Sequence, residues 1–241
     1  MKKLTLIAIA ATIVAFGVQG QGLVNFVNSS AAGTKISVNS AIGGGATGLT
    51  PAVAGSFYYA LFYSQTLSTV NGSGASIIPT LAGNGTYVWS DPVDWHFAGN
   101  GGPYTVNGTP FTSSGYATNV ATAGRISGGA PDAVGGVAAG GSAYFTVVGW
   151  SSNMGATWGA VQTLLSGGSL LPNMYLGESA VSPLLGTGDN FLAITPAIIQ
   201  TSGSIPGWTL GLVNVTLIPE PTTMALAGLA GLSLLLFRRR K

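Results

Sequence analysis

The chain has 241 residues, of which 46% are hydrophobic, 6% are charged and none is cysteine. This composition excludes a disordered chain, because disordered segments combine low hydropathy with high net charge. The lack of cysteine excludes disulfides, thiolate metal sites and cysteine nucleophiles.

The positive charge lies outside the central part of the chain. Six of the eight cations stand among the first three or the last four residues. Between residues 21 and 218, only Lys35 and Arg125 stand against five acidic residues, which gives this part a net charge of −3. A nucleic-acid-binding surface requires several Lys or Arg side chains to neutralise phosphates. Nucleic acid is therefore excluded as a partner.

The first twenty residues have the three-part layout of a secretory signal peptide. Two lysines precede an apolar run over residues 4–18, and the small residue Gly20 follows two positions later. We expect residues 1–20 to form a signal helix that signal peptidase removes by cutting between Gly20 and Gln21. The alternative is an uncleaved anchor, but the run is shorter than the ~20 residues that a spanning helix prefers.

The other end of the chain contains three elements in a fixed order. A Pro-Glu-Pro segment comes first and is held extended, because proline fixes φ and lacks a backbone donor. The apolar stretch 222–237 follows and predicts a transmembrane helix, about 24 Å long at 1.5 Å per residue. A basic cluster ends the chain and is expected to stay cytoplasmic as a membrane stop. It consists of Arg238, Arg239, Arg240 and Lys241.

This order of elements resembles the PEP-CTERM sorting domain of many Gram-negative bacteria. Pro219, Glu220 and Pro221 stand at its signature positions. The resemblance covers residues 219–241 and implies recognition by an exosortase in the inner membrane, removal of the helix, and delivery to the cell surface or extracellular matrix. It implies no activity for the rest of the chain. The alternative interpretation is a plain C-terminal membrane anchor.

Residues 21–218 are expected to form the exported body, with an all-β fold that is most typical of a single jelly-roll-like β-sandwich. Short β-branched and aromatic runs alternate with Asn-Gly dipeptides and other glycine-rich turns, as in such folds. The expected strands lie at residues 23–27, 36–38, 57–63, 87–89, 143–150 and 208–217.

One short helix is expected at residues 156–165. Three apolar side chains lie near one face at helical spacing, and a Gly-Gly pair follows that can end the helix. The three apolar residues are Trp158, Val161 and Leu165. The segment 143–152, Trp158 and the Gly-Glu-Ser at 177–179 are similar to stretches in PEP-CTERM proteins of Verrucomicrobia-like bacteria, a resemblance with no assigned activity.

The body has one cluster of titratable side chains, formed by Asp91, Asp94 and His96. The cluster can be interpreted as a carboxylate pair with a base, as part of an oxygen-ligand calcium site, or as a solvated loop in which Trp95 packs inward. The loop is favoured because Pro92 and neighbouring turns interrupt the segment. A single histidine excludes a His-rich zinc site. We expect no catalytic residue, no metal and no cofactor.

Two further groups of residues bear on carbohydrate chemistry. A glycosidase needs two carboxylates across a bond, and Asp132, Glu178 or Asp189 can in principle join Asp94. Six aromatic residues can form a sugar-stacking platform, although residues 57–63 are better explained as a core strand. The six aromatic residues are Tyr58, Tyr59, Tyr63, Trp95, Tyr104 and Trp150.

These observations predict a non-catalytic surface or extracellular-matrix protein that is sorted by an exosortase and associates with exopolysaccharide. The scarcity of charged groups and the many Gly, Ser, Thr and Asn residues suit hydrogen-bonded surfaces better than tuned proton transfer. The alternative is a secreted carbohydrate-binding module or a glycoside-active enzyme. The membrane is a partner only through the C-terminal helix, before processing.

Overall fold

The computed structural model describes residues 21–28, 32–39, 47–66, 77–81, 87–88, 94–101, 104–106, 109–167, 173–188, 197–201 and 203–213. The predicted signal helix and the whole sorting segment lie outside these ranges, as do Asp91 and Asp189. Of the predicted cleavage site, the structure describes Gln21, which is the first residue of a strand. Within the described ranges, no helix is long and apolar enough to cross a membrane.

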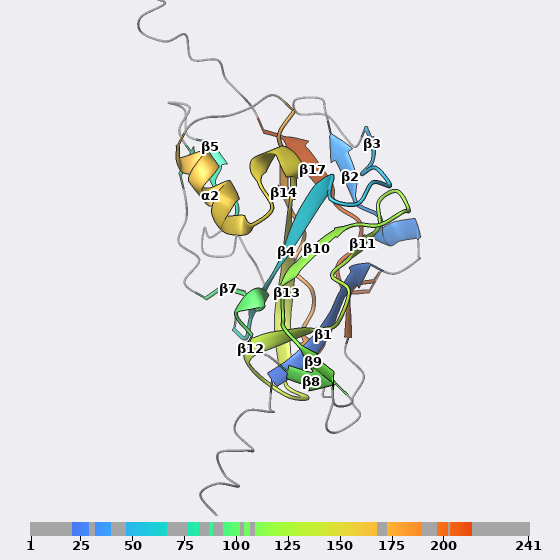
Figure 1. Ribbon diagram of the computed structural model, residues 1–241, viewed down its shortest axis with the longest axis vertical. Coiled ribbons are helices and arrows are strands. Elements are labelled where there is room, and N and C mark those ends of the chain that lie inside the picture. Colours follow the sequence, from blue (N-terminus) through green and yellow to red (C-terminus); the bar gives the residue numbers. More distant parts are fainter. Residues whose placement is uncertain are drawn as a thin grey trace, which may run out of the picture.

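The body is made of β-strands and one α-helix (Figure 1). The strands are β1 (Gln21–Asn28), β2 (Ser37–Asn39), β3 (Gly48–Leu49), β4 (Phe57–Ser64), β5 (Thr80–Leu81), β6 (Tyr87–Val88), β7 (His96–Phe97), β8 (Tyr104–Val106), β9 (Thr109–Phe111), β10 (Tyr116–Asn119), β11 (Ile126–Ser127), β12 (Asp132–Ala138), β13 (Ser142–Ser151), β14 (Tyr175–Glu178), β15 (Leu185–Gly186), β16 (Ala197–Gln200) and β17 (Thr209–Leu212). The helical elements are α2 (Trp158–Ser166) and the 3-10 turns η1 (Ala32–Thr34), η2 (Ala98–Asn100) and η3 (Ser152–Met154). The predicted all-β class is confirmed, and each of the six expected runs overlaps a strand.

Most strands belong to one large mixed sheet. Its order is β12-β1-β11-β10-β4-β13-β14-β17-β2-β3, while β7 pairs with β4, β15 with β13 and β16 with β1. The pairings β1–β16 and β17–β2 are parallel and join segments from opposite ends of the chain. The hairpin β8–β9 pairs Val106 with Thr109, as the intervening Asn-Gly dipeptide predicts.

Strands β4 and β13 form the centre of the sheet. Their antiparallel ladder runs from the pair Tyr144–Ser64 to the pair Ser151–Phe57. In β4 every side chain except Tyr58 is buried, and β13 is buried from Phe145 onward. Continuous apolar runs without polar alternation are typical of strands that are covered on both faces. Successive side chains of these strands therefore enter two different cores.

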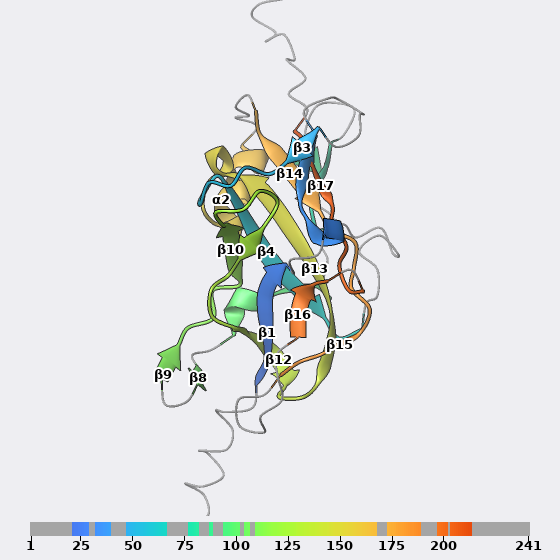
Figure 2. The same cartoon turned by 90° about the vertical axis from the view of Figure 1, so that its right-hand side faces the viewer.

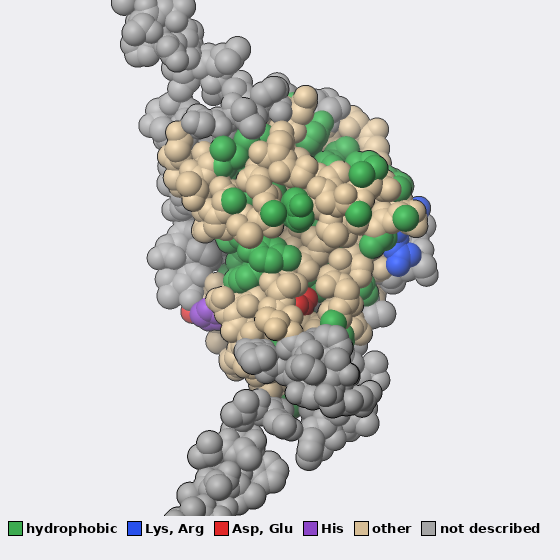
Figure 3. Space-filling view, viewed as in Figure 1, with side chains coloured by type: hydrophobic (Ala, Val, Ile, Leu, Met, Phe, Trp, Pro, Cys, Tyr) green, Lys and Arg blue, Asp and Glu red, His purple; other side chains and the backbone are tan. Residues whose placement is uncertain are grey.

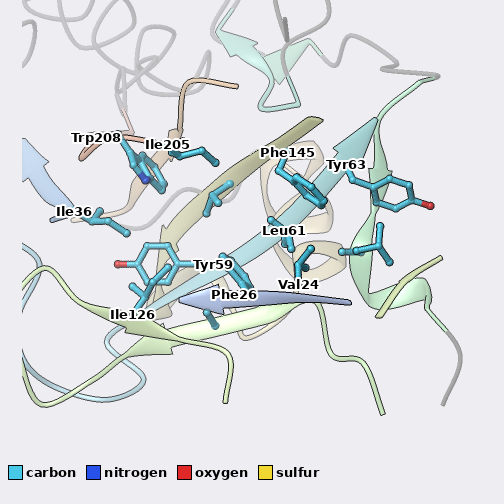
Figure 4. Close-up of a cluster of buried hydrophobic side chains, with 14 of the residues drawn as sticks. Val24, Phe26, Ile36, Tyr59, Leu61, Tyr63, Ile126, Phe145, Ile205 and Trp208 are labelled. Carbon is cyan, nitrogen blue, oxygen red and sulfur yellow. The ribbon is translucent and has the colours of Figure 1, made fainter. Parts of the chain in front are cut away.

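The larger core lies between the central strands and β1. Figure 4 shows Tyr59, Leu61 and Phe145 from the central strands facing Val24 and Phe26 of β1. Val24 and Phe26 are 0% and 1% exposed. Since β1 also continues the same sheet through β11 and β10, the sheet curves back over its own centre (Figure 2). This curvature produces the two packed layers of a sandwich from one hydrogen-bonded path.

The second core lies on the opposite face, beneath α2. Aromatic rings dominate it, with centroid separations of 5.7 Å between Trp150 and Trp158 and 5.8 Å between Phe62 and Trp158. Edge-to-face and tilted contacts at such distances stabilise by about 0.5–1.5 kcal/mol per pair beyond burial. The helix therefore packs on the sheet through Trp158, together with Val161 and Leu165.

The predicted helix is confirmed, together with its buried face of Trp158, Val161 and Leu165. The Thr157 side chain caps its first turn by accepting a hydrogen bond from Ala160 N at 3.3 Å. A glycine follows the last helical residue, as the sequence predicts.

Two serine hydroxyls extend the ladder of β13 beyond the end of β14. Ser179 Oγ accepts a hydrogen bond from Val147 N, and Ser182 Oγ accepts one from Phe145 N, each at 2.9 Å. The backbone N–H groups of the same serines donate to the carbonyls of Val147 and Phe145. All four residues are buried. The two serines thus take the place of a neighbouring strand as hydrogen-bond partners of β13.

We predict that Ser179→Ala lowers the free energy of unfolding by about 1–3 kcal/mol, because the buried Val147 N–H loses an acceptor. Urea denaturation of the mature protein measures this loss. Ser142→Ala, at an exposed position of β13, is the matched control and should change the free energy of unfolding by no more than about 0.5 kcal/mol. Equal effects of the two substitutions would contradict the assignment.

Candidate functional site

Of the cluster predicted around residue 94, the structure describes Asp94, Trp95 and His96. Asp94 and His96 are exposed, whereas Trp95 is 6% exposed and belongs to the core beneath α2. His96 pairs with Tyr63 across the β7–β4 ladder, and the two rings lie 5.5 Å apart. The geometry corresponds to a solvated segment with an inward tryptophan, the interpretation that the sequence favours.

The described acidic side chains lie in different parts of the fold. Asp94 precedes β7, Asp132 begins β12, and Glu178 ends β14, where its Oε1 accepts a hydrogen bond from Ile77 N at 3.2 Å. In the part of the chain that the structure describes, no group of three or more His, Cys, Asp or Glu side chains could hold a metal ion. Asp189 lies outside that part.

Asp132 is the buried acid of the described body, with 2% of its surface exposed. Its Oδ1 accepts hydrogen bonds from the backbone N–H groups of Ser114 and Gly115, both at 3.0 Å, and from Ser113 Oγ at 3.3 Å. Its backbone pairs with Val24 of β1. One carboxyl oxygen therefore joins the segment before β10 to the start of β12.

Burial raises the pKa of Asp132 above the ordinary range of an aspartic acid, and the hydrogen bonds from Gly115, Ser114 and Ser113 oppose the rise. Oδ2 is also buried and has no hydrogen-bond partner among the described residues. The desolvation of this second oxygen favours the neutral form. Sequence reasoning considered Asp132 only as a partner for catalysis, whereas its contacts are those of a structural carboxyl group.

The structure bears out the core-strand interpretation of residues 57–63 and not the alternative of a sugar-stacking platform. Four of the six aromatic side chains are buried, Tyr58 is half-buried, and the Tyr104 side chain lies outside the description. The buried ones are Tyr59, Tyr63, Trp95 and Trp150. Three of them belong to β4 and β13, whose two faces both enter cores, so their rings are not available to a ligand.

A different set of rings is partly exposed on one face of the sheet, and we call Tyr58, Phe97 and Tyr116 the ring row. Phe97 and Tyr116 have centroids 4.8 Å apart, and Tyr116 and Tyr58 lie 6.2 and 6.5 Å from the buried Trp150 ring. They come from β4, β7 and β10, which are hydrogen-bonded neighbours. Figure 3 shows apolar side chains emerging among polar ones on the face over these strands.

Sequence reasoning missed two members of the ring row. Phe97 follows a buried tryptophan and an exposed histidine, and Tyr116 follows a glycine at the start of a four-residue strand. Neither stands in a periodic run long enough to indicate a face. Only the pairing of β7 and β10 with β4 brings the two rings together.

The Tyr116 ring is held in place by the helix. Its Oη accepts a hydrogen bond from Trp158 N at 3.0 Å, in the first turn of α2. The N-terminal N–H groups of a helix have no partner within the helix, so this bond satisfies one of them. A ring that is fixed by both packing and a hydrogen bond loses little further freedom when a ligand binds.

The chain has a β-rich, sparsely charged body, followed by a Pro-Glu-Pro segment, an apolar stretch and a basic end. This arrangement is that of a surface protein that is exported and sorted. Residues 217–241 match the PEP-CTERM protein-sorting motif, which confirms the resemblance carried by Pro219, Glu220 and Pro221. The motif implies export and exosortase-mediated sorting to the cell surface. No curated protein and no solved structure matches the chain.

We predict that the stability of the protein falls as the pH rises from the ordinary pKa of an aspartic acid to the raised pKa of Asp132. Over this interval the folded state binds the proton more readily than the unfolded state, so deprotonation costs stability. Asp132→Asn keeps an Oδ1 acceptor and cannot ionise. It should reduce this dependence in urea denaturation between about pH 4 and pH 8.

Asp94→Asn changes an exposed carboxylate and is the matched control, which should keep the wild-type pH dependence. A wild-type pH dependence in Asp132→Asn would show that Asp132 is not its source.

Proposed function

We propose that the body is a non-catalytic component of the cell surface or extracellular matrix that associates with exopolysaccharide. The observation that carries this proposal is the sorting motif at residues 217–241, joined to a body with few charged side chains. Two of the three described acids, Asp132 and Glu178, support a non-catalytic role. Asp132 already binds three donors inside the fold, and Glu178 binds a backbone N–H.

The polar character of the surface supports a neutral polymer as the partner. On the face in Figure 3, Lys, Arg, Asp and Glu occupy small areas among uncharged groups. Hydroxyl and amide groups can exchange hydrogen bonds with water for hydrogen bonds with sugar hydroxyls without desolvating a charge, which is the costlier process.

The ring row is the best-supported contact site for such a polymer. Flat aromatic faces pack well against the weakly polar faces of sugar rings. Phe97 and Tyr116 contact each other, and Tyr58 lies beside the Trp150 ring that Tyr116 also contacts. Trp150 and α2 hold the row in place from the side, because Tyr116 contacts the Trp150 ring and accepts a hydrogen bond from Trp158 N. The site is therefore preformed.

The alternative is a secreted carbohydrate-binding module or a glycoside-active enzyme. The ring row itself suits a binding module. Asp94 and His96 favour an enzyme, because both are exposed and the histidine directly precedes Phe97. Binding of the host polymer without cleavage separates the proposed function from the enzyme.

We predict that the mature protein sediments with exopolysaccharide from its own host and releases no reducing ends. Tyr58→Leu and Phe97→Leu keep apolar packing but remove the flat ring, so each should weaken binding by about 1 kcal/mol, roughly fivefold. Circular dichroism verifies folding. Leu184→Ala, at an exposed apolar position next to β15, which pairs with β13 and not with the strands of the ring row, is the control and should leave binding unchanged.

Two outcomes would contradict the proposal. Failure of the wild type to sediment with the polymer would remove the matrix role. Release of reducing ends that Asp94→Ala abolishes would identify an enzyme instead.

A further inference from the structure

The body exposes a run of apolar side chains next to β2, β3 and β11, in residues 49–54, which we call the apolar loop. Its sequence is Leu-Thr-Pro-Ala-Val-Ala, and every side chain in it except Thr50 is exposed. Three large hydrophobic side chains are exposed in the described body, and two of them, Leu49 at 41% and Val53 at 60%, belong to this loop. Single apolar residues are common on protein surfaces, whereas a contiguous exposed run indicates a contact surface.

The two cations of the body lie beside the apolar loop. Thr50 N donates a hydrogen bond to Ile36 O at 3.0 Å, and Thr50 O accepts one from Gly124 N at 2.8 Å. Ile36 directly follows Lys35, and Gly124 directly precedes Arg125. Figure 3 shows the Lys and Arg side chains gathered on one edge of the molecule, beside hydrophobic side chains. Segments that are far apart in the sequence thus bring both cations to the apolar loop.

Both cationic side chains are directed to the surface. Lys35 and Arg125 are half-buried, whereas the residues that follow them, Ile36 and Ile126, are 0% and 1% exposed. Successive side chains of extended backbone point to opposite sides, so the cations point outward where the isoleucines point inward. The Arg125 guanidinium also donates a hydrogen bond to Asn28 O at 2.8 Å, which fixes its position.

The charge of this region is opposite to that of the body as a whole. Residues 32–39, 47–56 and 119–127 contain two cations and no acid, although the body has a net charge of −3. Exposed apolar side chains beside cations suit a lipid surface, because the apolar groups enter the boundary between headgroups and acyl chains while the cations stay among the phosphates. A dissolved polyanion would use the cations and gain nothing from the apolar loop.

We propose that the apolar loop, Lys35 and Arg125 form a contact site for a lipid surface that carries anionic headgroups. The sequence predicts a membrane contact only through the C-terminal stretch, so this site is an additional one. Two cations and a short apolar loop provide a weak and reversible contact. The ring row belongs to β4, β7 and β10, so the lipid site does not depend on the proposed binding of polysaccharide.

Sedimentation with vesicles tests the site. The mature protein is mixed, without polysaccharide, with vesicles of phosphatidylglycerol and phosphatidylethanolamine or with vesicles of phosphatidylcholine alone. Binding should be stronger to the anionic vesicles and should weaken as salt screens the charges. Lys35→Gln should weaken it roughly fivefold, because one cation near the headgroups is removed. Val53→Ser should weaken it roughly threefold or more, and Val53→Trp should strengthen it, because tryptophan is favoured at membrane interfaces.

Leu184→Ser is the matched control, since Leu184 is 54% exposed and lies next to β15, outside the three segments of the site. It should bind anionic vesicles as the wild type does, and circular dichroism verifies the folding of each variant. Equal binding to the two kinds of vesicle, or binding to neither, would overturn the proposal. Binding that Lys35→Gln weakens but both Val53 variants leave unchanged would also overturn it, because the site would then be one for a polyanion.

Discussion

The burial of both faces of the β4–β13 pair is the constraint on which the rest of the structure depends. An eight-pair ladder of largely apolar residues cannot leave either face in water. One face is covered by β1 and β12, for which the sheet must curve back, and the other is covered by α2 and the segment around Trp95. The curvature of the sheet, the position of the helix and the inward tryptophans all follow from this requirement.

The same constraint decides where polar groups can act. Inside the body they are used to complete hydrogen bonding, as in the serine hydroxyls beside β13 and the Asp132 carboxyl beneath the segment 113–115. A buried polar group without a partner is costly, so these side chains have structural roles. The partners of the protein must then be recognised by the surface, where uncharged groups and the ring row remain.

Contiguous features of the fold and the site could be predicted from the sequence, and features that depend on distant pairing could not. Strands β4 and β13 were evident from continuous apolar runs, and α2 from the spacing of Trp158, Val161 and Leu165. The sorting motif was recognisable because its three elements follow one another directly.

By contrast, β12 contains an aspartate and two glycines and lacks the pattern of a strand, and the parallel pairing of β1 with β16 has no local signal. The continuous apolar run at 57–63 indicated a core strand, but it did not reveal that Tyr58 is the residue of β4 that stays partly exposed.

We propose that the N-terminal segment exports the body, that the sorting motif at residues 217–241 directs it to the cell surface, and that both terminal segments are then removed. Intact-mass analysis of the protein from the surface fraction of its host tests this claim most directly. The account predicts a species that begins at Gln21 and lacks residues 222–241. A full-length species that is recovered only by extracting the membrane would contradict it.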